Sequence, residues 1–338
     1  MKPELSLPKL RYLLTVPSIR LAGLSPSGYL LSAWTSVSIA RIVLLTDRIL
    51  LPEPSALSKN DTSAICMELV AAAHSGGVGV IDIPAEAELT EPVRITLSGD
   101  DGQLVHGHLL MRAGRFSKAT VVLTHAGHAA YSEVLTVLAG DGADLTVVTL
   151  QEWDDRSQHL AEHDVVVGRD ATVKHIAVTP GGGIVRLNTN ATYAGPGGTF
   201  EGYGVYFADA GQHQEHRLFV DHEAPHCRSN VEYKGALQGE DAHTVWVGDV
   251  LIRAAAEGTD TYELNRNLLL TDGARADSVP NLEIETGEIA GAGHASATGR
   301  FDDQQLFYLM ARGIPEAEAR RLVVRGFFAT VVSKIGVP

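Results

Sequence analysis

The chain has 338 residues and a net charge of −14, and such an acidic surface disfavours nucleic acid or an anionic membrane as its main partner. Aromatic residues make up only 6% of the chain and glycine accounts for 34 residues, which favours many turns over a large aromatic core. Cys66 and Cys227 are the only cysteines, too few for a disulfide framework. A reducing, cytoplasmic location is therefore expected.

Residues 1–75 form the first of three predicted segments, and they are irregular. Leu21–Ala40 carries no charge over 20 residues, a length that could span a bilayer. Pro26 and six serine or threonine residues lower its apolar density, so we expect a loop-rich segment rather than a membrane helix or a signal peptide. Asn60–Ala73 is the best predicted helix here, because its apolar residues recur on one face, and Cys66 is expected to be a small buried residue on it.

The second predicted segment, residues 76–297, consists of short β-rich runs closed by glycine, proline or charged residues. No long helical pattern interrupts these runs before about residue 295. A succession of short strands predicts a sandwich, a barrel, a propeller or a β-helix. The fold class is therefore predicted to be mainly β.

Internal repetition favours one of these architectures. Gly140, Gly168 and Gly195 each open a similar motif, at spacings of 28 and 27 residues, and a weaker echo begins at Gly239. Repeat periods of about 20 to 50 residues predict stacked units that bury a continuous apolar column. The pattern therefore favours a parallel β-helix, with a β-sandwich as the alternative. In the three copies the fourth residue is small and the sixth is large and apolar: Ala143 and Leu145, Ala171 and Val173, Gly198 and Phe200.

The change from β to helical spacing falls between Leu282 and Phe328. The sequence first alternates like a strand and then breaks in a predicted Gly/Ala turn that holds one histidine, His294. Residues 298–338 form the third predicted segment, with an aspartate N-cap at position 302 or 303 and a second helix opening at Pro315. The apolar residues of these two helices must pack on the β core or on a partner. They are Leu306, Phe307, Met310, Leu322, Val323, Phe327, Phe328, Val331 and Ile335.

The densest group of polar residues runs from His213 to Cys227 and contains four histidines, three carboxylates and the thiol. Imidazole and thiolate suit iron, zinc or copper, but these spacings match no zinc motif. In a strand, His216 and His222 share a face and His213 points away. The sequence favours solvated polar groups over a metal site and leaves open whether any of them, His226 included, binds metal. Cys227 is expected to be inert.

Searches for catalytic motifs give no match. Gly181-Gly182-Gly183 lacks the Lys-Ser/Thr pair of a nucleotide-binding loop, and no G-x-S-x-G elbow or C-x-x-C pair is present. A non-catalytic chain without a nucleotide site is expected. On these grounds alone His294 is a surface histidine.

The closing sequence LEIETGEIAGAGHASATGRFDDQQLFYLMARGI, followed by EAEARRLVVRGFF, is specific. Together with Tyr233–Leu237, Val245–Ile252 and Asn267–Leu270 upstream, it resembles the SufB/SufD family of iron–sulfur cluster assembly proteins. The resemblance covers residues 78–338, is strongest from about residue 200, and does not extend to the first 75 residues. It implies a right-handed parallel β-helix with helical segments at both ends.

The flanks of His294 distinguish the two branches of the family. SufB-like chains carry a cysteine before this histidine and a glutamate after it, whereas Gly293 and Ala295 stand here, so the chain resembles the SufD branch. The resemblance implies that His294 is a metal ligand for a transient Fe–S cluster shared with SufB. A good but labile imidazole ligand suits a cluster that must leave.

The resemblance also implies partners. SufB pairs through its β-helix, the C-terminal helices hold a SufC ATPase, and a cysteine desulfurase supplies sulfur to the complex. The sequence leaves open whether the complex also binds a reduced flavin. The residues expected to bind partners are Phe307, Tyr308, Arg312, Arg321, Phe327 and Phe328.

Two alternative functions remain at this point. A SufB-like homodimeric scaffold is disfavoured by the missing cysteine and glutamate beside His294. A carbohydrate-active β-helix enzyme is disfavoured by the histidine-rich sequence, although a fold alone does not define a function.

Overall fold

The computed structural model describes residues 71, 74–75, 77–100 and 102–335, together with the backbone of two short strands at 20–21 and 41–45. Most of the uncharged stretch at 21–40 and of the helix expected at 60–73 lies outside the described residues. Ala71, at the end of that range, is helical and fully buried. In the part of the chain that the structure describes, no helix has the length and apolar character needed to cross a membrane.

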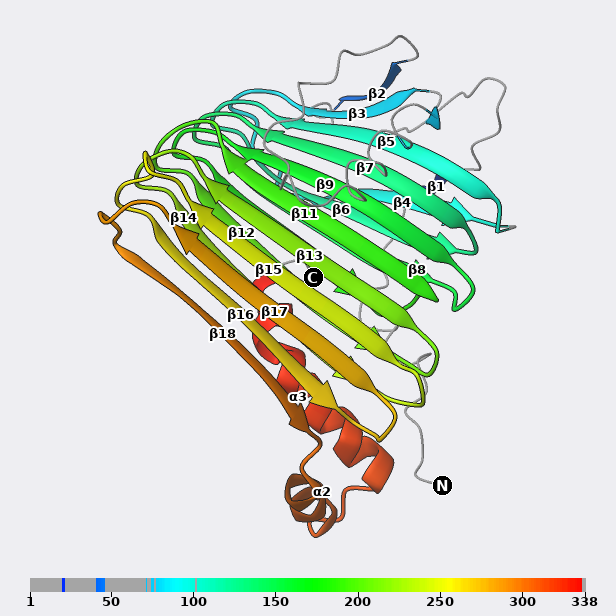
Figure 1. Ribbon diagram of the computed structural model, residues 1–338. Coiled ribbons are helices and arrows are strands. Elements are labelled where there is room, and N and C mark those ends of the chain that lie inside the picture. Colours follow the sequence, from blue (N-terminus) through cyan, green and yellow to red (C-terminus); the bar gives the residue numbers. More distant parts are fainter. Residues whose placement is uncertain are drawn as a thin grey trace.

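The described chain forms a parallel β-solenoid of about eight turns, which confirms the predicted fold class (Figure 1). From β3 onward, successive strands alternate between two nine-stranded sheets, so that each turn contributes one strand to each sheet, whereas β2 pairs antiparallel with β3 in the same sheet. The first sheet, sheet A, contains β1 (Arg20–Leu21), β4 (Val93–Gly99), β6 (Lys118–Gly127), β8 (Asp144–Trp153), β10 (Thr172–Thr179), β12 (Thr199–Ala208), β14 (Arg228–Leu237), β16 (Asp260–Leu269) and β18 (Gly291–Arg300). The second, sheet B, contains β2 (Arg41–Leu45), β3 (Val78–Ile83), β5 (Leu104–Ala113), β7 (Ala130–Ala139), β9 (Gln158–Val167), β11 (Ile184–Tyr193), β13 (His213–His222), β15 (His243–Ile252) and β17 (Arg275–Ile284).

The glycine repeat lies at one corner of the solenoid, where the chain passes from sheet B to sheet A. Leu145, Val173 and Phe200 stand in direct register on β8, β10 and β12, and each side chain is 0% exposed. They are part of one apolar cluster that runs through the coils. The predicted stacking of the repeats is therefore confirmed. The echo at Gly239 lies at the opposite corner, between β14 and β15, which explains why its apolar position is displaced.

The inner faces of the sheets also carry polar side chains, which the repeat pattern did not indicate. Several are almost fully buried, and they include Glu133, His159, His163, His175, His216 and Glu263. Burial lowers the pKa of His216 to about 3 and that of His222 to about 4, so both imidazoles are neutral at pH 7. The interior of the solenoid thus contains buried polar side chains as well as apolar ones.

Two helices follow the last strand. α2 (Asp303–Met310) is capped by Asp302, whose carboxylate accepts a hydrogen bond from the backbone N–H of Gln304 at 2.8 Å, as predicted. α3 (Glu316–Ile335) lies on the outer face of sheet A, against β12 and β14. Val324, Phe328 and Val331 are buried there against outward-facing residues of the sheet. α2 projects beyond the end of the solenoid (Figure 1).

The Gly/Ala-rich segment around His294 is a strand, and the prediction of a turn is wrong. Gly291–Arg300 forms β18 and pairs along its whole length with β16. Pairing supplies its backbone hydrogen bonds, and its small residues allow close packing, since a Cβ on Gly293 would lie 3.3 Å from the Tyr262 ring. The helical period accordingly begins only after Arg300.

Candidate functional site

His294 lies on the inner face of the last strand of sheet A. In the register of that sheet it follows Glu263 on β16, Val231 on β14, Gly202 on β12 and His175 on β10. His175 is 0% exposed, whereas the side chain of His294 is 43% exposed. The difference arises because none of the described residues forms a further coil over β18.

Glu263 lies directly beneath His294. Its Oε1 is 3.7 Å from Nδ1 of His294, and the Glu263 side chain is only 1% exposed. Neither carboxylate oxygen has a hydrogen-bond partner among the described residues. Burial, followed by the negative charge of Asp249, raises the pKa of Glu263 to about 8. The carboxyl is therefore mostly protonated at pH 7.

Space for this carboxyl depends on a glycine in the other sheet. A Cβ on Gly248 of β15 would lie 2.3 Å from Glu263 Oε2 and 2.3 Å from the Trp246 ring. The site thus consists of an exposed imidazole over a buried carboxyl, with an indole alongside. The sequence did not predict a role for Glu263. Its neighbours on the inner face of β16, Thr261, Asn265 and Asn267, are polar too, so apolar–polar alternation does not mark this face as buried.

The donor atoms of this site suit a transition metal. The Nε2 atom of His294 is available for coordination, and imidazole binds iron well. A cation that approaches His294 would favour the ionised form of Glu263 and lower its pKa. The two residues supply at most two ligands, and their neighbours Gly293 and Ala295 offer no side-chain donor.

The coil around His294 is open on both sheets. β17 and β18 each pair with only one strand among the described residues, β15 and β16 respectively. Pro280 lies in β17, a position that suits an edge strand because proline lacks an N–H. The inward-facing Ser278 and Ser296 lie across the open end, with their hydroxyls 2.7 Å apart. Among the described residues, both sheets therefore end in a half-exposed strand that is paired along one edge only.

The residues predicted to bind partners fall into exposed and buried sets. Phe307 and Tyr308 are 74% and 57% exposed on α2, and the Arg312 guanidinium stacks 3.4 Å from the centre of the Tyr308 ring. Arg321 is partly exposed and pairs with Glu318. Two residues instead attach α3 to the solenoid: Phe328 is buried, and the carbonyl of the half-buried Phe327 accepts a hydrogen bond from Lys234 Nζ at 3.0 Å.

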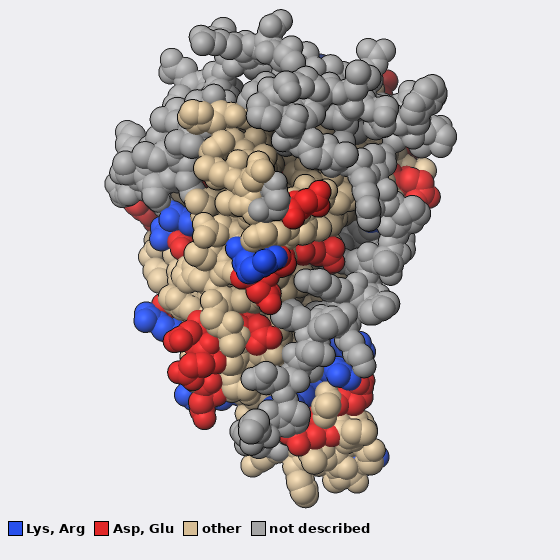
Figure 2. All heavy atoms as spheres, turned by 90° about the vertical axis from the view of Figure 1, so that its right-hand side faces the viewer, with Lys and Arg blue, Asp and Glu red and all other residues tan. Residues whose placement is uncertain are grey.

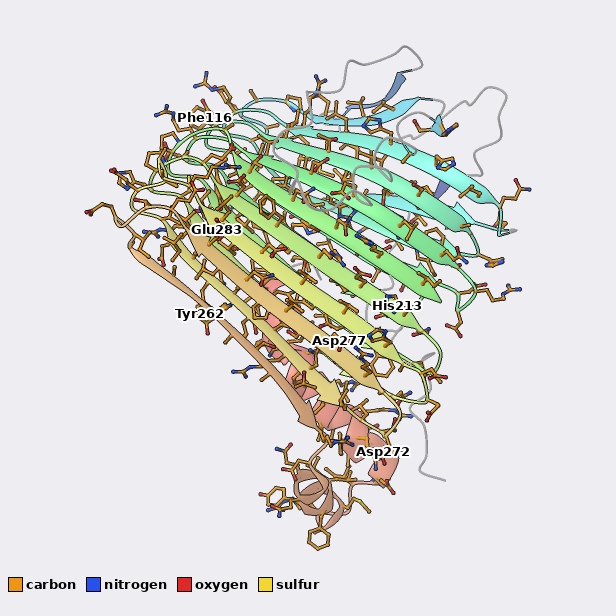
Figure 3. All side chains as sticks on the ribbon, in the orientation of Figure 1. Phe116, His213, Tyr262, Asp272, Asp277 and Glu283 are labelled. Atoms are coloured by element: carbon orange, nitrogen blue, oxygen red, sulfur yellow. The ribbon has the colours of Figure 1, made fainter. Side chains whose placement is uncertain are left out.

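The polar group from His213 to Cys227 does not converge on one point. As predicted, His216 and His222 face the interior, whereas His213 lies on the outer face of sheet B, together with Asp277 (Figure 3). Nδ1 of His213 lies 3.2 Å from Nδ1 of His243, whose Nε2 is 2.9 Å from Asp277. Burial raises the pKa of the Cys227 thiol, which agrees with an inert residue.

Comparison with known proteins identifies the family of this chain. Residues 95–327 match the family described as SUF system FeS cluster assembly, SufBD core domain. An iron–sulfur cluster assembly SufBD family protein of Mycobacterium tuberculosis is 56% identical over 266 residues, which cover 77% of this chain and 67% of that protein. The iron–sulfur cluster assembly protein SufD of Escherichia coli is 25% identical over 75% of this chain and 60% of its own length, and SufD of Bacillus subtilis is 26% identical over 78% and 62%. The chain belongs to the SufBD family of iron–sulfur cluster assembly proteins.

Proposed function

We propose that this chain is the SufD-type scaffold subunit of a SufBCD-type complex, and that it pairs with a SufB-type chain through its last coil. The observation that carries the proposal is the open end of the solenoid at His294. Two unpaired strand edges offer backbone donors and acceptors to a partner strand. Tyr262, Val279 and Ile284 are 47%, 45% and 43% exposed near this end, and a partner would cover them.

In this proposal His294 supplies half of a site for a nascent iron–sulfur cluster, which is the cargo of the complex. Its own strand offers no thiolate and no second imidazole. A partner chain must therefore provide the remaining ligands. Glu263 holds a proton beside the imidazole until the cluster's positive iron arrives, and it then becomes a carboxylate that can compensate that charge. Because Glu263 loses its proton only when iron binds, the site contains no uncompensated buried charge before or after binding.

The two terminal helices are proposed to bind a SufC-type ATPase. α2 presents Phe307, Tyr308 and Met310 to solvent, with Met310 42% exposed, and the tip of the molecule that it forms shows few charges (Figure 2). α3 is anchored to β12 and β14, and β14 is paired with β16, which carries Glu263. A force applied to the helices would therefore reach the open coil through one continuous sheet.

Replacing His294 with alanine tests the cluster site. The variant, coexpressed with SufB-type and SufC-type partners, should form the complex but lose most of the iron and sulfide acquired on anaerobic reconstitution. His213→Ala is the control, because His213 is also partly exposed but lies on the outer face of sheet B. Equal iron and sulfide in the two variants would refute the ligand role of His294. A homodimer of this chain that excludes the SufB-type partner would refute the pairing.

The helix assignment has its own test. Phe307→Ala combined with Tyr308→Ala should abolish copurification with the ATPase while leaving the thermal unfolding of the chain unchanged. Phe116→Ala is the matched control, since Phe116 is 61% exposed at a corner of the solenoid far from α2 (Figure 3). Retention of the ATPase by the double variant would show that it binds elsewhere.

A further inference from the structure

A second cluster of metal-ligating side chains lies inside the solenoid, far along the chain from His294. Its centre is Glu133 on β7, and Oε2 of this carboxylate is approached by three imidazole nitrogens. Nε2 of His125 lies 3.1 Å away, Nε2 of His159 lies 3.2 Å away and Nε2 of His163 lies 3.7 Å away. All four side chains are 0% exposed.

The orientation of His159 is set by a further contact. Its Nδ1 lies 2.8 Å from Oε1 of Gln151, an acceptor, so Nδ1 carries the hydrogen. Nε2 of the neutral ring then presents a lone pair to the Glu133 carboxylate. Two lone pairs that face each other at 3.2 Å in a buried site repel unless a cation lies between them. Metal-bound histidines are commonly oriented in this way, with the second nitrogen donating to an oxygen.

The spacing of the donor atoms suits a small divalent ion. In a tetrahedral site with metal–ligand bonds of about 2.0–2.1 Å, neighbouring ligand atoms are about 3.3 Å apart. The His125 and His159 nitrogens lie at 3.1 and 3.2 Å from Glu133 Oε2, close to this value. The three ligand atoms together lie within 4.8 Å of one another, so a bound ion would draw them closer. His163 Nε2 has no hydrogen-bond partner among the described residues and is the nearest fourth donor.

We propose that His125, Glu133 and His159 bind one divalent transition-metal ion of the Zn²⁺ or Fe²⁺ class, with His163 as the fourth ligand. Two imidazoles and a carboxylate form a donor set that both ions accept. The site is closed, because its residues are fully buried and rings of Tyr131 and Trp153 lie 5.2 and 5.6 Å from the His159 ring. The ion is therefore structural: it joins β6 of sheet A to β7 and β9 of sheet B.

This ion is distinct from the cluster cargo proposed at His294. The interior ligands lie on β6, β7 and β9, whereas His294 lies on β18, at the end of the solenoid. Metal bound only by the folded chain stabilises the fold, and it enters during folding rather than through a channel. Loss of metal from the interior site would therefore not affect cluster binding at His294, and the reverse also holds.

The test measures metal in the full chain carrying His294→Ala, so that iron at the open coil is not counted. The protein is refolded anaerobically with Zn²⁺ or Fe²⁺, freed of surface metal with a chelator, and analysed for metal and acid-labile sulfide. We expect about one ion per chain without sulfide, and about a tenfold loss of metal in Glu133→Gln and His159→Gln. His216→Gln is the matched control, because His216 is an equally buried imidazole, 2% exposed, that makes no contact with Glu133. It should retain the ion.

Two results would overturn the proposal. The first is a chain that refolds with excess metal and yet contains none, in which case protons alone hold the imidazoles around Glu133. The second is a metal content that His159→Gln and His216→Gln lower equally. If the variants do not fold, refolding of the parent chain with and without metal decides: the metal-refolded protein should melt at least several degrees higher, and identical melting curves would refute the site.

Discussion

The interior cluster around Glu133 and the open coil around His294 use the same chemical groups in opposite surroundings. Each pairs a glutamate with histidine on inward-facing positions of the solenoid. In the interior, the coils on either side bury the glutamate and the histidines, and three imidazole nitrogens lie within 3.7 Å of one carboxylate oxygen of Glu133. At the end, one imidazole is exposed over one protonated carboxyl. The position of a coil within the stack thus decides whether a site is closed and structural or open to a partner.

Truncation of inward-facing leucines would sharpen this comparison most strongly. Leu145 is fully buried within the stack, whereas Leu282 belongs to the same apolar cluster but is only partly buried on β17. Leu145→Ala should lower the free energy of unfolding by about 3 kcal/mol and Leu282→Ala by about 1 kcal/mol, because less surface is withdrawn from water at the open end. Urea unfolding of the isolated chain measures both. When a partner covers the last coil, Leu282→Ala should lower the free energy of unfolding by more than it does in the isolated chain. If Leu145→Ala and Leu282→Ala were equally destabilising in the isolated chain, the contrast between the interior and the open end would be wrong.

His216 makes the interior sensitive to acid. Its pKa is about 3 in the folded chain against 6.5 for the free side chain, so the unfolded state binds an extra proton between these values. This contribution to stability is complete above pH 6.5 and is lost as the pH falls towards 3. Between pH 7 and pH 5 the loss should be about 2 kcal/mol smaller in His216→Gln than in the parent, as read from urea unfolding at each pH. Parallel pH profiles would show that His216 is solvated.

Glu263 should give the open coil the opposite response. Its pKa of about 8 in the folded chain exceeds the ordinary 4.5, so its contribution is fully present below pH 4.5 and is lost as the pH rises through 8. Glu263→Gln cannot ionise, and at pH 6 it should already be more stable than the parent by roughly 1–2 kcal/mol. At pH 4.5 the two should be alike. An advantage of the variant that stays constant with pH would contradict the assignment.

The smallest expected effect on stability is that of His294→Ala. The side chain is 43% exposed and its contact with Glu263 is 3.7 Å long, so the free energy of unfolding should change by less than about 0.5 kcal/mol. Thermal unfolding of the isolated chain checks this. A large destabilisation would mean that His294 is a structural residue, and a loss of cluster assembly in the same variant could no longer be attributed to a missing ligand.

The sequence by itself determined the stacked β architecture, because its period of 27 to 28 residues matches the strand register that brings Leu145, Val173 and Phe200 together. It also determined the family and the position of the exposed histidine, through the motif around His294. Alternation of apolar and polar residues reports only two faces of a strand, however, and it cannot say which face is covered.

Tertiary structure alone decided where the polar groups meet. His125, Glu133 and His159 are spread over 35 positions and two sheets, and only coil stacking brings their donor atoms together. Glu263 reaches His294 because β16 and β18 are in register, although they are 31 positions apart. The small residues around His294 predicted a turn, and pairing with β16 made them a strand. In each case long-range pairing, which local sequence does not encode, placed the side chain.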